Sequence, residues 1–245
     1  MNHRRYFASL GVAALIATPA LAGPPYVTDD PEPTGVGHYE IYLFAGGTAT
    51  RDRSAGAGGI DFNYGAAPDL QLTAVVPIGW DNPQNGASST GFGNIELAAK
   101  YEFLHQDEFG VDVSFFPRVS LPASSAPLGE RHVSLQLPVW IQRNWGAWTT
   151  FGGGGCTLDH GNGAKNSCLF GWAVTNQVAP HLQLGAEIYH ETAEMAGGKA
   201  STGLGFGATY DLNDTLHLMA SAGPGIQNAQ ETGHYTWYAA LLLTF

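Results

Sequence analysis

The feature that most constrains this chain is a series of segments, each about ten residues long, in which apolar and polar side chains alternate from His38 to the C-terminus. A period of two is typical of strands that present different faces to two environments. Clusters of Gly, Asp, Asn and Pro separate the segments and favour turns. The segments span residues 38–49, 55–64, 69–79, 92–103, 109–120, 132–142, 147–157, 167–177, 181–191, 200–210, 215–223 and 235–245. We therefore expect an all-β fold of about 12 antiparallel strands.

The composition of the two faces indicates which face lies inside. A soluble β-sandwich buries its apolar face and exposes a face rich in Lys, Glu and Arg. Here only 13% of the residues are charged, and the polar faces carry mainly Gly, Ala, Ser and Thr with isolated charges. This mixture resembles the lining of a closed barrel whose apolar face meets lipid, and about ten residues suffice for a tilted membrane strand. We predict a transmembrane up-and-down β-barrel over residues 38–245.

The links between the segments alternate in length. Five links have three to five residues and lie near 65–68, 104–108, 143–146, 178–180 and 211–214. Those near 80–91, 121–131, 158–166, 192–199 and 224–234 have eight to twelve residues, and 50–54 is the short exception. Bacterial outer-membrane barrels have short periplasmic turns and longer outer loops. We therefore expect both His38 and Phe245 on the periplasmic side.

Residues 1–22 have the pattern of a secretory signal peptide. Arg4 and Arg5 form a basic start, a short apolar core follows, and Ala20-Leu21-Ala22 is a small-residue cleavage site. An uncleaved anchor helix is the alternative, but Pro19 and the short core argue against it. Without this segment the chain has 8 basic residues (10 minus Arg4 and Arg5) and 21 acidic residues, a net charge of −13. This charge excludes a nucleic-acid partner, because phosphate binding needs clustered Lys and Arg.

Residues 23–37 contain four of the 14 prolines and cannot form a helix or a central strand. The segment either hangs in the periplasm or enters the barrel as a plug. Its acidic side chains, Asp29, Asp30 and Glu32, could pair with Lys100 or Arg118 inside the barrel. Tyr26 and Val27 would gain by burial there.

The two cysteines, Cys156 and Cys168, lie at equal distances from Asn162 in a Gly-Asn-Gly turn. A cross-strand pair in a hairpin has this arrangement. In an exported protein a disulfide is favoured over two free thiols, and a metal site would need two further ligands.

The last segment, residues 235–245, places Tyr235, Trp237 and Leu241 on one face and ends in Phe245. It resembles the terminal strand by which outer-membrane barrels are recognised for assembly. We expect the barrel-assembly machinery to be a partner that binds this strand.

Several short segments resemble one family. Residues 25–34 read Pro-Tyr-Val-Thr-Asp-Asp-Pro-Glu-Pro-Thr, and residues 37–42 read Gly-His-Tyr-Glu-Ile-Tyr. Gly-Phe-Gly-Asn-Ile-Glu-Leu follows at 91–97, Trp-Thr-Thr-Phe-Gly-Gly-Gly-Gly at 148–155 and Gly-Ala-Glu-Ile-Tyr-His at 185–190. Together they resemble the outer-membrane family named for the meta-pathway of phenol degradation, over most of the mature chain. The resemblance implies a transporter of aromatic or hydrophobic compounds. The cysteine pair is not part of that pattern.

Motifs typical of enzymes are weak in this chain. Gly91-Phe92-Gly93 lacks the third glycine of a dinucleotide loop, and Gly152 to Gly155 lacks the Lys of a phosphate loop. The nine histidines include no pair with zinc-enzyme spacing. His132-Val133-Ser134 matches the His-x-Ser pair of twelve-stranded outer-membrane phospholipases, but alternation turns both polar side chains inward, away from lipid. We expect neither catalysis, nor a cofactor, nor a bound metal.

The inward charges are the candidate lining of the lumen. An ion-paired network that fills the barrel and a hydrated path are both compatible with them, because twelve strands lie between filled eight-stranded barrels and sixteen-stranded porins. The candidate residues are Glu40, Glu96, Lys100, Glu102, Asp112, Arg118, Glu187 and His217.

Together these features predict a barrel in the bacterial outer membrane, surrounded by lipid, that admits small hydrophobic or aromatic solutes by passive passage. Two alternatives stay open. One is a structural or adhesive barrel without an open path, which a conductance measurement would distinguish. The other is a lipid-modifying enzyme, which requires His132 and Ser134 to face lipid.

Overall fold

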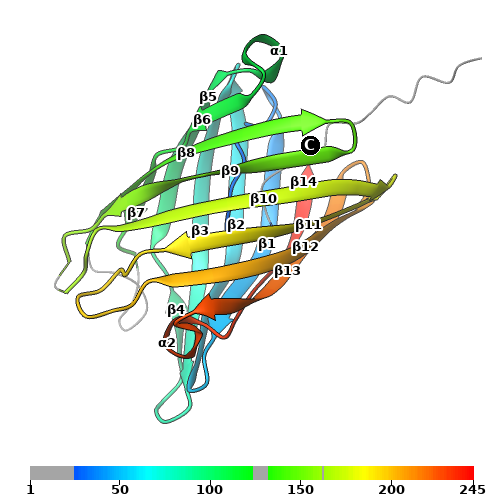
Figure 1. Ribbon diagram of the computed structural model, residues 1–245. Helices are drawn as coiled ribbons and strands as arrows, with labels where there is room; N and C mark the ends of the chain where they lie inside the picture. Colours follow the sequence, from blue (N-terminus) through cyan, green and yellow to red (C-terminus); the bar gives the residue numbers. More distant parts are fainter. Residues whose placement is uncertain (1–24, 124–131, 162) are drawn as a thin grey trace, which may run out of the picture.

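The computed structural model describes residues 25–123, 132–161 and 163–245, so the predicted signal peptide at residues 1–22 lies outside the described residues. One antiparallel sheet accounts for nearly all of the described chain, and it curls into a barrel (Figure 1). The strands are β1 (Tyr39–Ala49), β2 (Arg53–Ala67), β3 (Leu70–Pro83), β4 (Ser89–Phe92), β5 (Ile95–Leu104), β6 (Asp112–Phe115), β7 (Arg118–Leu121), β8 (Ser134–Trp145), β9 (Trp148–Leu158), β10 (Ser167–Ala179), β11 (Leu182–Glu191), β12 (Ser201–Asn213), β13 (Leu216–Gln227) and β14 (Tyr235–Thr244). The helices are α1 (Gln106–Phe109) and α2 (Ala229–Thr232).

Two of the twelve strands of the barrel are each interrupted once. Both β4 and β5 pair with β3, so they form one strand broken at Gly93-Asn94. Both β6 and β7 pair with β5 and β8, so they form another strand broken at Phe116-Pro117. Proline has no backbone N–H for the ladder, and Phe116 turns into the interior, where it is buried. The predicted number of twelve strands is confirmed, whereas the continuous strands expected at 92–103 and 109–120 were wrong in this detail.

The barrel closes between its first and last strands. β1 pairs with β14 from Glu40↔Thr244 to Ala49↔Tyr235 without a shift in register. Closure gives β1 and β14 a partner on both sides, which matters because an unsatisfied backbone group in hydrocarbon costs several kcal/mol.

The outward face of the strands is apolar, as predicted. Leu43 on β1, Ile60 on β2 and Leu218 on β13 are each nearly half exposed. Trp80 and Trp237 stack with ring centroids 6.1 Å apart. Aromatic rings on the outer face are typical of the girdles at the two membrane interfaces.

The links define two rims. The short-turn rim carries the turns that follow β2, β5, β8, β10 and β12, together with His38 and Phe245. The opposite, long-loop rim carries the turns and loops that follow β1, β3, β7, β9, β11 and β13. The short link expected at 104–108 instead contains the single turn of α1. The hairpin of β2 and β3 also reaches further than expected, with Arg53 opposite Pro83. Within the described residues no helix is long and apolar enough to cross a membrane.

The disulfide joins Cys156 and Cys168, which lie directly opposite each other on β9 and β10. The pair is near the long-loop rim. The centre of the intervening turn, Asn162, lies outside the described residues.

Candidate functional site

Residues 25–37 are called the interior segment from here on: residues 25–34 lie inside the barrel, and residues 35–37 lie at the short-turn rim, where Val36 is exposed. The side chains of Thr28, Asp30 and Thr34 are buried, with exposed fractions of 0%, 2% and 4%. Prolines at 25, 31 and 33 lack a backbone N–H and keep residues 25–34 from pairing as a strand, while Val36 forms an isolated bridge with Gly65. The backbone polar groups of residues 25–34 are therefore left for side chains to satisfy.

Glu187 on β11 holds the first part of the interior segment. Its Oε1 accepts a hydrogen bond from the Val27 N–H at 3.0 Å. Its Oε2 accepts bonds from the Thr28 N–H at 3.0 Å and from the Thr28 hydroxyl at 2.9 Å. A carboxylate that accepts three such bonds in a buried place makes a strong, charge-assisted anchor.

Two cations hold the centre of the interior segment. The Lys100 ammonium lies 3.2 Å from Asp29 Oδ1 and 3.5 Å from Asp30 Oδ1. The Arg118 guanidinium lies 3.0 Å from Asp29 Oδ2 and 3.0 Å from Glu96 Oε1. Both cations also lie over the ring of Phe116, at 4.8 Å and 4.2 Å from its centroid. The inward turn of Phe116 at the break between β6 and β7 thus places an aromatic face beneath this charge cluster.

Neutral side chains hold the last part of the interior segment. Gln142 and Asn144 on β8 donate hydrogen bonds to Glu32 Oε1. Gln71 Oε1 accepts bonds from the N–H and the hydroxyl of Thr34 at 2.8 and 3.0 Å. These amides are not predictable from the sequence, because uncharged polar residues on an inward face carry no distinct signal.

An apolar cluster fills another part of the interior. Tyr42, Met219, Ala240 and Leu242 are buried there, and Phe44 and Tyr238 pack against them. These side chains come from β1, β13 and β14. The sequence predicts a polar lumen and does not predict this apolar cluster. One part of the lumen wall is therefore apolar and another part is charged.

Two cavities lie at opposite ends of the interior segment. A cavity of about 330 Å³ at one end is lined by residues of both chemical kinds, among them Tyr26, Phe44, Glu96, Arg118 and Tyr238. A cavity of about 500 Å³ at the other end, which we call the vestibule, opens at the short-turn rim. Thr34 and Gly35 line the vestibule, so the interior segment separates the two spaces.

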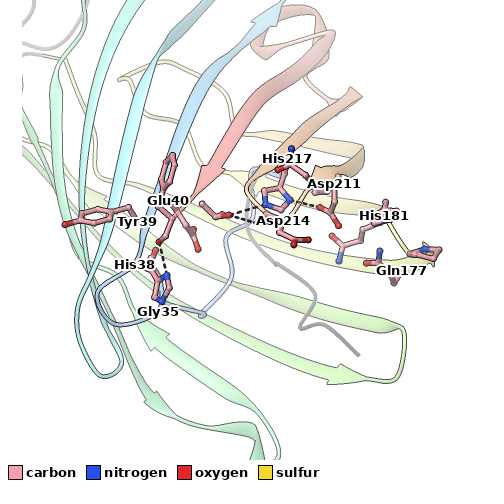
Figure 2. A pocket seen from close by; sticks show the side chains of 16 residues that line it. Gly35, His38, Tyr39, Glu40, Gln177, His181, Asp211, Asp214 and His217 are labelled. Carbon is pink, nitrogen blue, oxygen red and sulfur yellow. Dashed lines mark hydrogen bonds and ion pairs between the residues drawn. The ribbon is translucent and has the colours of Figure 1, made fainter. Parts of the chain in front are cut away.

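Figure 2 shows the vestibule and its polar lining. His217 Nδ1 lies 2.7 Å from Asp211 Oδ1, and the His217 side chain is buried. His38 Nδ1 lies 2.8 Å from the carbonyl oxygen of Phe245. This contact links the residue before the first strand, β1, to the C-terminal residue of the chain. Glu40 accepts a hydrogen bond from the Tyr42 hydroxyl at 3.1 Å.

The eight residues predicted to line the lumen fall into three groups. Glu96, Lys100, Arg118 and Glu187 meet at or beside the interior segment. Glu40 and His217 line the vestibule. Glu102 and Asp112 lie at the short-turn rim, where Glu102 pairs with His105 at 3.2 Å and Asp112 accepts a bond from the Gln106 N–H at 2.6 Å.

The His-x-Ser pair lies near the long-loop rim. Ser134 is buried and pairs across the sheet with Ser120, while Val133 beside it is exposed. His132 forms an ion pair with Asp159. A lipid-modifying site needs its nucleophile on the outer surface, and Ser134 does not lie there.

Comparisons with known proteins agree with this architecture. A family model described as "Putative MetA-pathway of phenol degradation" matches residues 28–239. An outer membrane channel from Pseudomonas putida F1 is similar over 88% of this chain and 98% of its own, with 15% identity and a TM-score of 0.74. No curated protein sequence matches the chain.

Two further barrels are similar at lower scores. The CymD monoaromatic hydrocarbon channel has 8% identity and a TM-score of 0.49, over 86% of this chain and 88% of its own. Outer membrane phospholipase A from Escherichia coli has 12% identity and a TM-score of 0.44, over 89% and 92%. The similarity to the Pseudomonas channel shows that the fold is that of a bacterial outer-membrane β-barrel.

Proposed function

Because the chain belongs to the outer-membrane family named for the meta-pathway of phenol degradation, we propose that it is a passive channel for small hydrophobic or aromatic compounds. In this proposal the interior segment is a plug that closes the lumen and must move before a solute passes. The observation that carries the proposal is the position of this segment between the 330 Å³ cavity and the vestibule.

The lining of the 330 Å³ cavity supports this class of solute. Tyr26, Phe44 and Tyr238 offer aromatic faces, while Arg118 and Glu96 offer a cation and a carboxylate. Ligand pockets in proteins range over roughly 300–1,000 Å³ and combine apolar walls with a few polar groups that fix orientation. A space at the small end of this range suits one aromatic ring with a polar substituent.

The contacts of the interior segment set the barrier to opening. Its movement must break the three bonds to Glu187 and the pairs of Asp29 and Asp30 with Lys100. Gly37 lies two residues before the start of β1 and has a φ of 79°, a conformation that glycine adopts without strain. We place the hinge of the movement at Gly35–Gly37, because such residues absorb large backbone changes.

A single substitution tests whether the anchor controls passage. Glu187→Gln keeps the shape of the side chain but removes its charge and replaces one acceptor oxygen with an NH2 donor, so at least one of the three hydrogen bonds is lost. We expect the single-channel conductance or the open fraction in planar lipid bilayers to rise severalfold.

Glu191→Gln is the matched control. Glu191 lies on the same face of β11, four residues further along, and accepts a bond from the Ser201 hydroxyl at 3.3 Å. We expect this variant to conduct like the unmodified protein. If both folded variants conduct like the unmodified protein, Glu187 does not hold the plug.

A closed structural barrel is the second candidate. The observation that favours it is the dense network of ion pairs and hydrogen bonds around the interior segment. A protein of this kind shows no conductance and no solute uptake, even when the interior segment is removed.

A further inference from the structure

A group of three metal-ligating side chains lies at the short-turn rim, away from the interior segment. We propose that Asp69, Glu102 and His105 bind one divalent transition-metal ion, with Zn²⁺ as the best match to their chemistry. This site goes beyond the proposed transport function and does not depend on it.

The three side chains converge from separate parts of the chain. Asp69 lies in the turn between β2 and β3, Glu102 lies near the end of β5, and His105 immediately precedes α1, which marks this end of the barrel in Figure 1. His105 Nδ1 is 3.2 Å from Glu102 Oε1, and His105 Nε2 is 3.6 Å from Asp69 Oδ2. One ligand atom from each residue can be chosen so that all three lie within 4.8 Å of one another.

An ion binds only one of the two imidazole nitrogens, so the relevant measure for a single site is the set of three ligand atoms that lie within 4.8 Å of one another. Zn²⁺ binds imidazole nitrogen and carboxylate oxygen at about 2.0–2.2 Å, so two ligands of a tetrahedral site lie roughly 3.4 Å apart. A separation of 4.8 Å, the upper limit in this group, has to shorten by about 1.4 Å for tight coordination. The Asp69 side chain is 42% exposed, so it has room to rotate toward the other two. Water would complete the coordination.

The electrostatic surroundings favour a doubly charged cation. In the described part of the chain, the ion pairs of Asp69 and Glu102 are both made with His105. His105 is therefore the basic partner of both carboxylates, and Asp107 adds a third negative charge beside them. A bound divalent cation would balance these carboxylate charges.

Hydrogen bonds hold the surrounding backbone in place. The Glu102 N–H donates to the Asp69 carbonyl oxygen at 3.0 Å, which fixes two ligands relative to each other. The Gln106 N–H donates to Asp112 Oδ1 at 2.6 Å, and the Gln106 side-chain amide donates to the Asn144 carbonyl oxygen at 2.9 Å. The turn that carries His105 is thus attached to β6 and β8. Such supporting contacts orient the ligands and improve metal affinity.

The mature protein in detergent, without a polyhistidine tag and stripped with a chelator, provides the test. Zn²⁺ is titrated in competition with a chromophoric indicator, and Co²⁺ is added separately to record its visible absorption spectrum. We expect one equivalent of Zn²⁺ to bind. In His105→Ala and, separately, Asp69→Asn we expect the affinity to fall by at least about tenfold and the Co²⁺ absorption bands to weaken.

His181→Ala is the control. His181 lies in another turn of the same rim and is not one of the three ligands. We expect this variant to retain the one equivalent of bound Zn²⁺ with less than a threefold change in affinity. Heat-modifiable migration in electrophoresis establishes that each variant is folded. Failure of the unmodified protein to bind Zn²⁺, or equal binding by folded His105→Ala, would overturn the proposal.

Discussion

At the scale of single residues, the wall of the barrel depends on glycines that lie beneath aromatic rings. Gly152 on β9 faces Trp172 on β10, and Gly154 faces Phe170. A Cβ atom added at Gly152 would approach the ring of Trp172 and lie 2.6 Å from the Gly171 carbonyl oxygen. The run of four glycines from Gly152 to Gly155 lacks the Lys of a phosphate-binding loop. The close approach of neighbouring strands explains these glycines instead.

We predict that Gly152→Ala destabilises the barrel by about 1–3 kcal/mol, because the added methyl group overpacks the wall. Gly233→Ala is the matched control, since a Cβ atom there would meet its nearest neighbour, Thr48 Cβ, at an ordinary 3.7 Å. The measurement is the midpoint of urea unfolding in lipid vesicles, followed by tryptophan fluorescence. Equal midpoints for the two variants would contradict the explanation.

The sequence predicts which side chains point inward but not what they meet. Alternation places Lys100, Arg118 and Glu187 inside, because each lies on the polar face of its strand. The same alternation also turns Met219 and Leu242 inward, yet it does not show that they form an apolar cluster. The group of Asp69, Glu102 and His105 cannot be predicted from the spacing of these residues in the sequence. Asp69 and Glu102 are 33 residues apart, and the register between β3 and β5 brings them together.

At the scale of elements, the strand pattern is regular enough to reveal twelve strands but not their interruptions. Pro117 is the one strong signal for the break between β6 and β7, and a proline at the end of a strand gives the same signal. The break between β4 and β5 follows Gly93, whose N–H donates to the Pro77 carbonyl oxygen at 2.9 Å. Both interruptions depend on contacts with neighbouring strands, which a local pattern does not contain.

The last strand makes the clearest prediction at this scale. Deletion of Tyr235 to Phe245 removes β14, the partner of both β1 and β13, and leaves two unpaired edges. It also removes the terminal Phe245 through which we propose that the barrel-assembly machinery recognises the chain. We expect no heat-modifiable barrel in outer-membrane fractions, measured by electrophoresis with and without boiling. Normal accumulation of folded barrel would contradict the closure shown here.

At the scale of the whole molecule, the two rims give the barrel a direction in the membrane. The loop between β3 and β4 lies on the long-loop rim, and the turn after β12 lies on the short-turn rim. We predict that an epitope tag at Asn85 is labelled by antibody on intact cells, while a tag at Asn213 is labelled only after the outer membrane is permeabilised. The opposite pattern would reverse the orientation and place the vestibule outside.

The central claim is that the interior segment closes an otherwise passable lumen. It is tested most directly by single-channel recording of a variant that lacks residues 25–35 but keeps residues 1–22 and folds normally. The deletion removes Asp29, Asp30 and Glu32 from the lumen and joins the 330 Å³ cavity to the vestibule. We predict a conductance several times that of the unmodified protein, together with faster uptake of small aromatic solutes. Unchanged conductance and uptake in the correctly inserted variant would show that the segment is not the barrier.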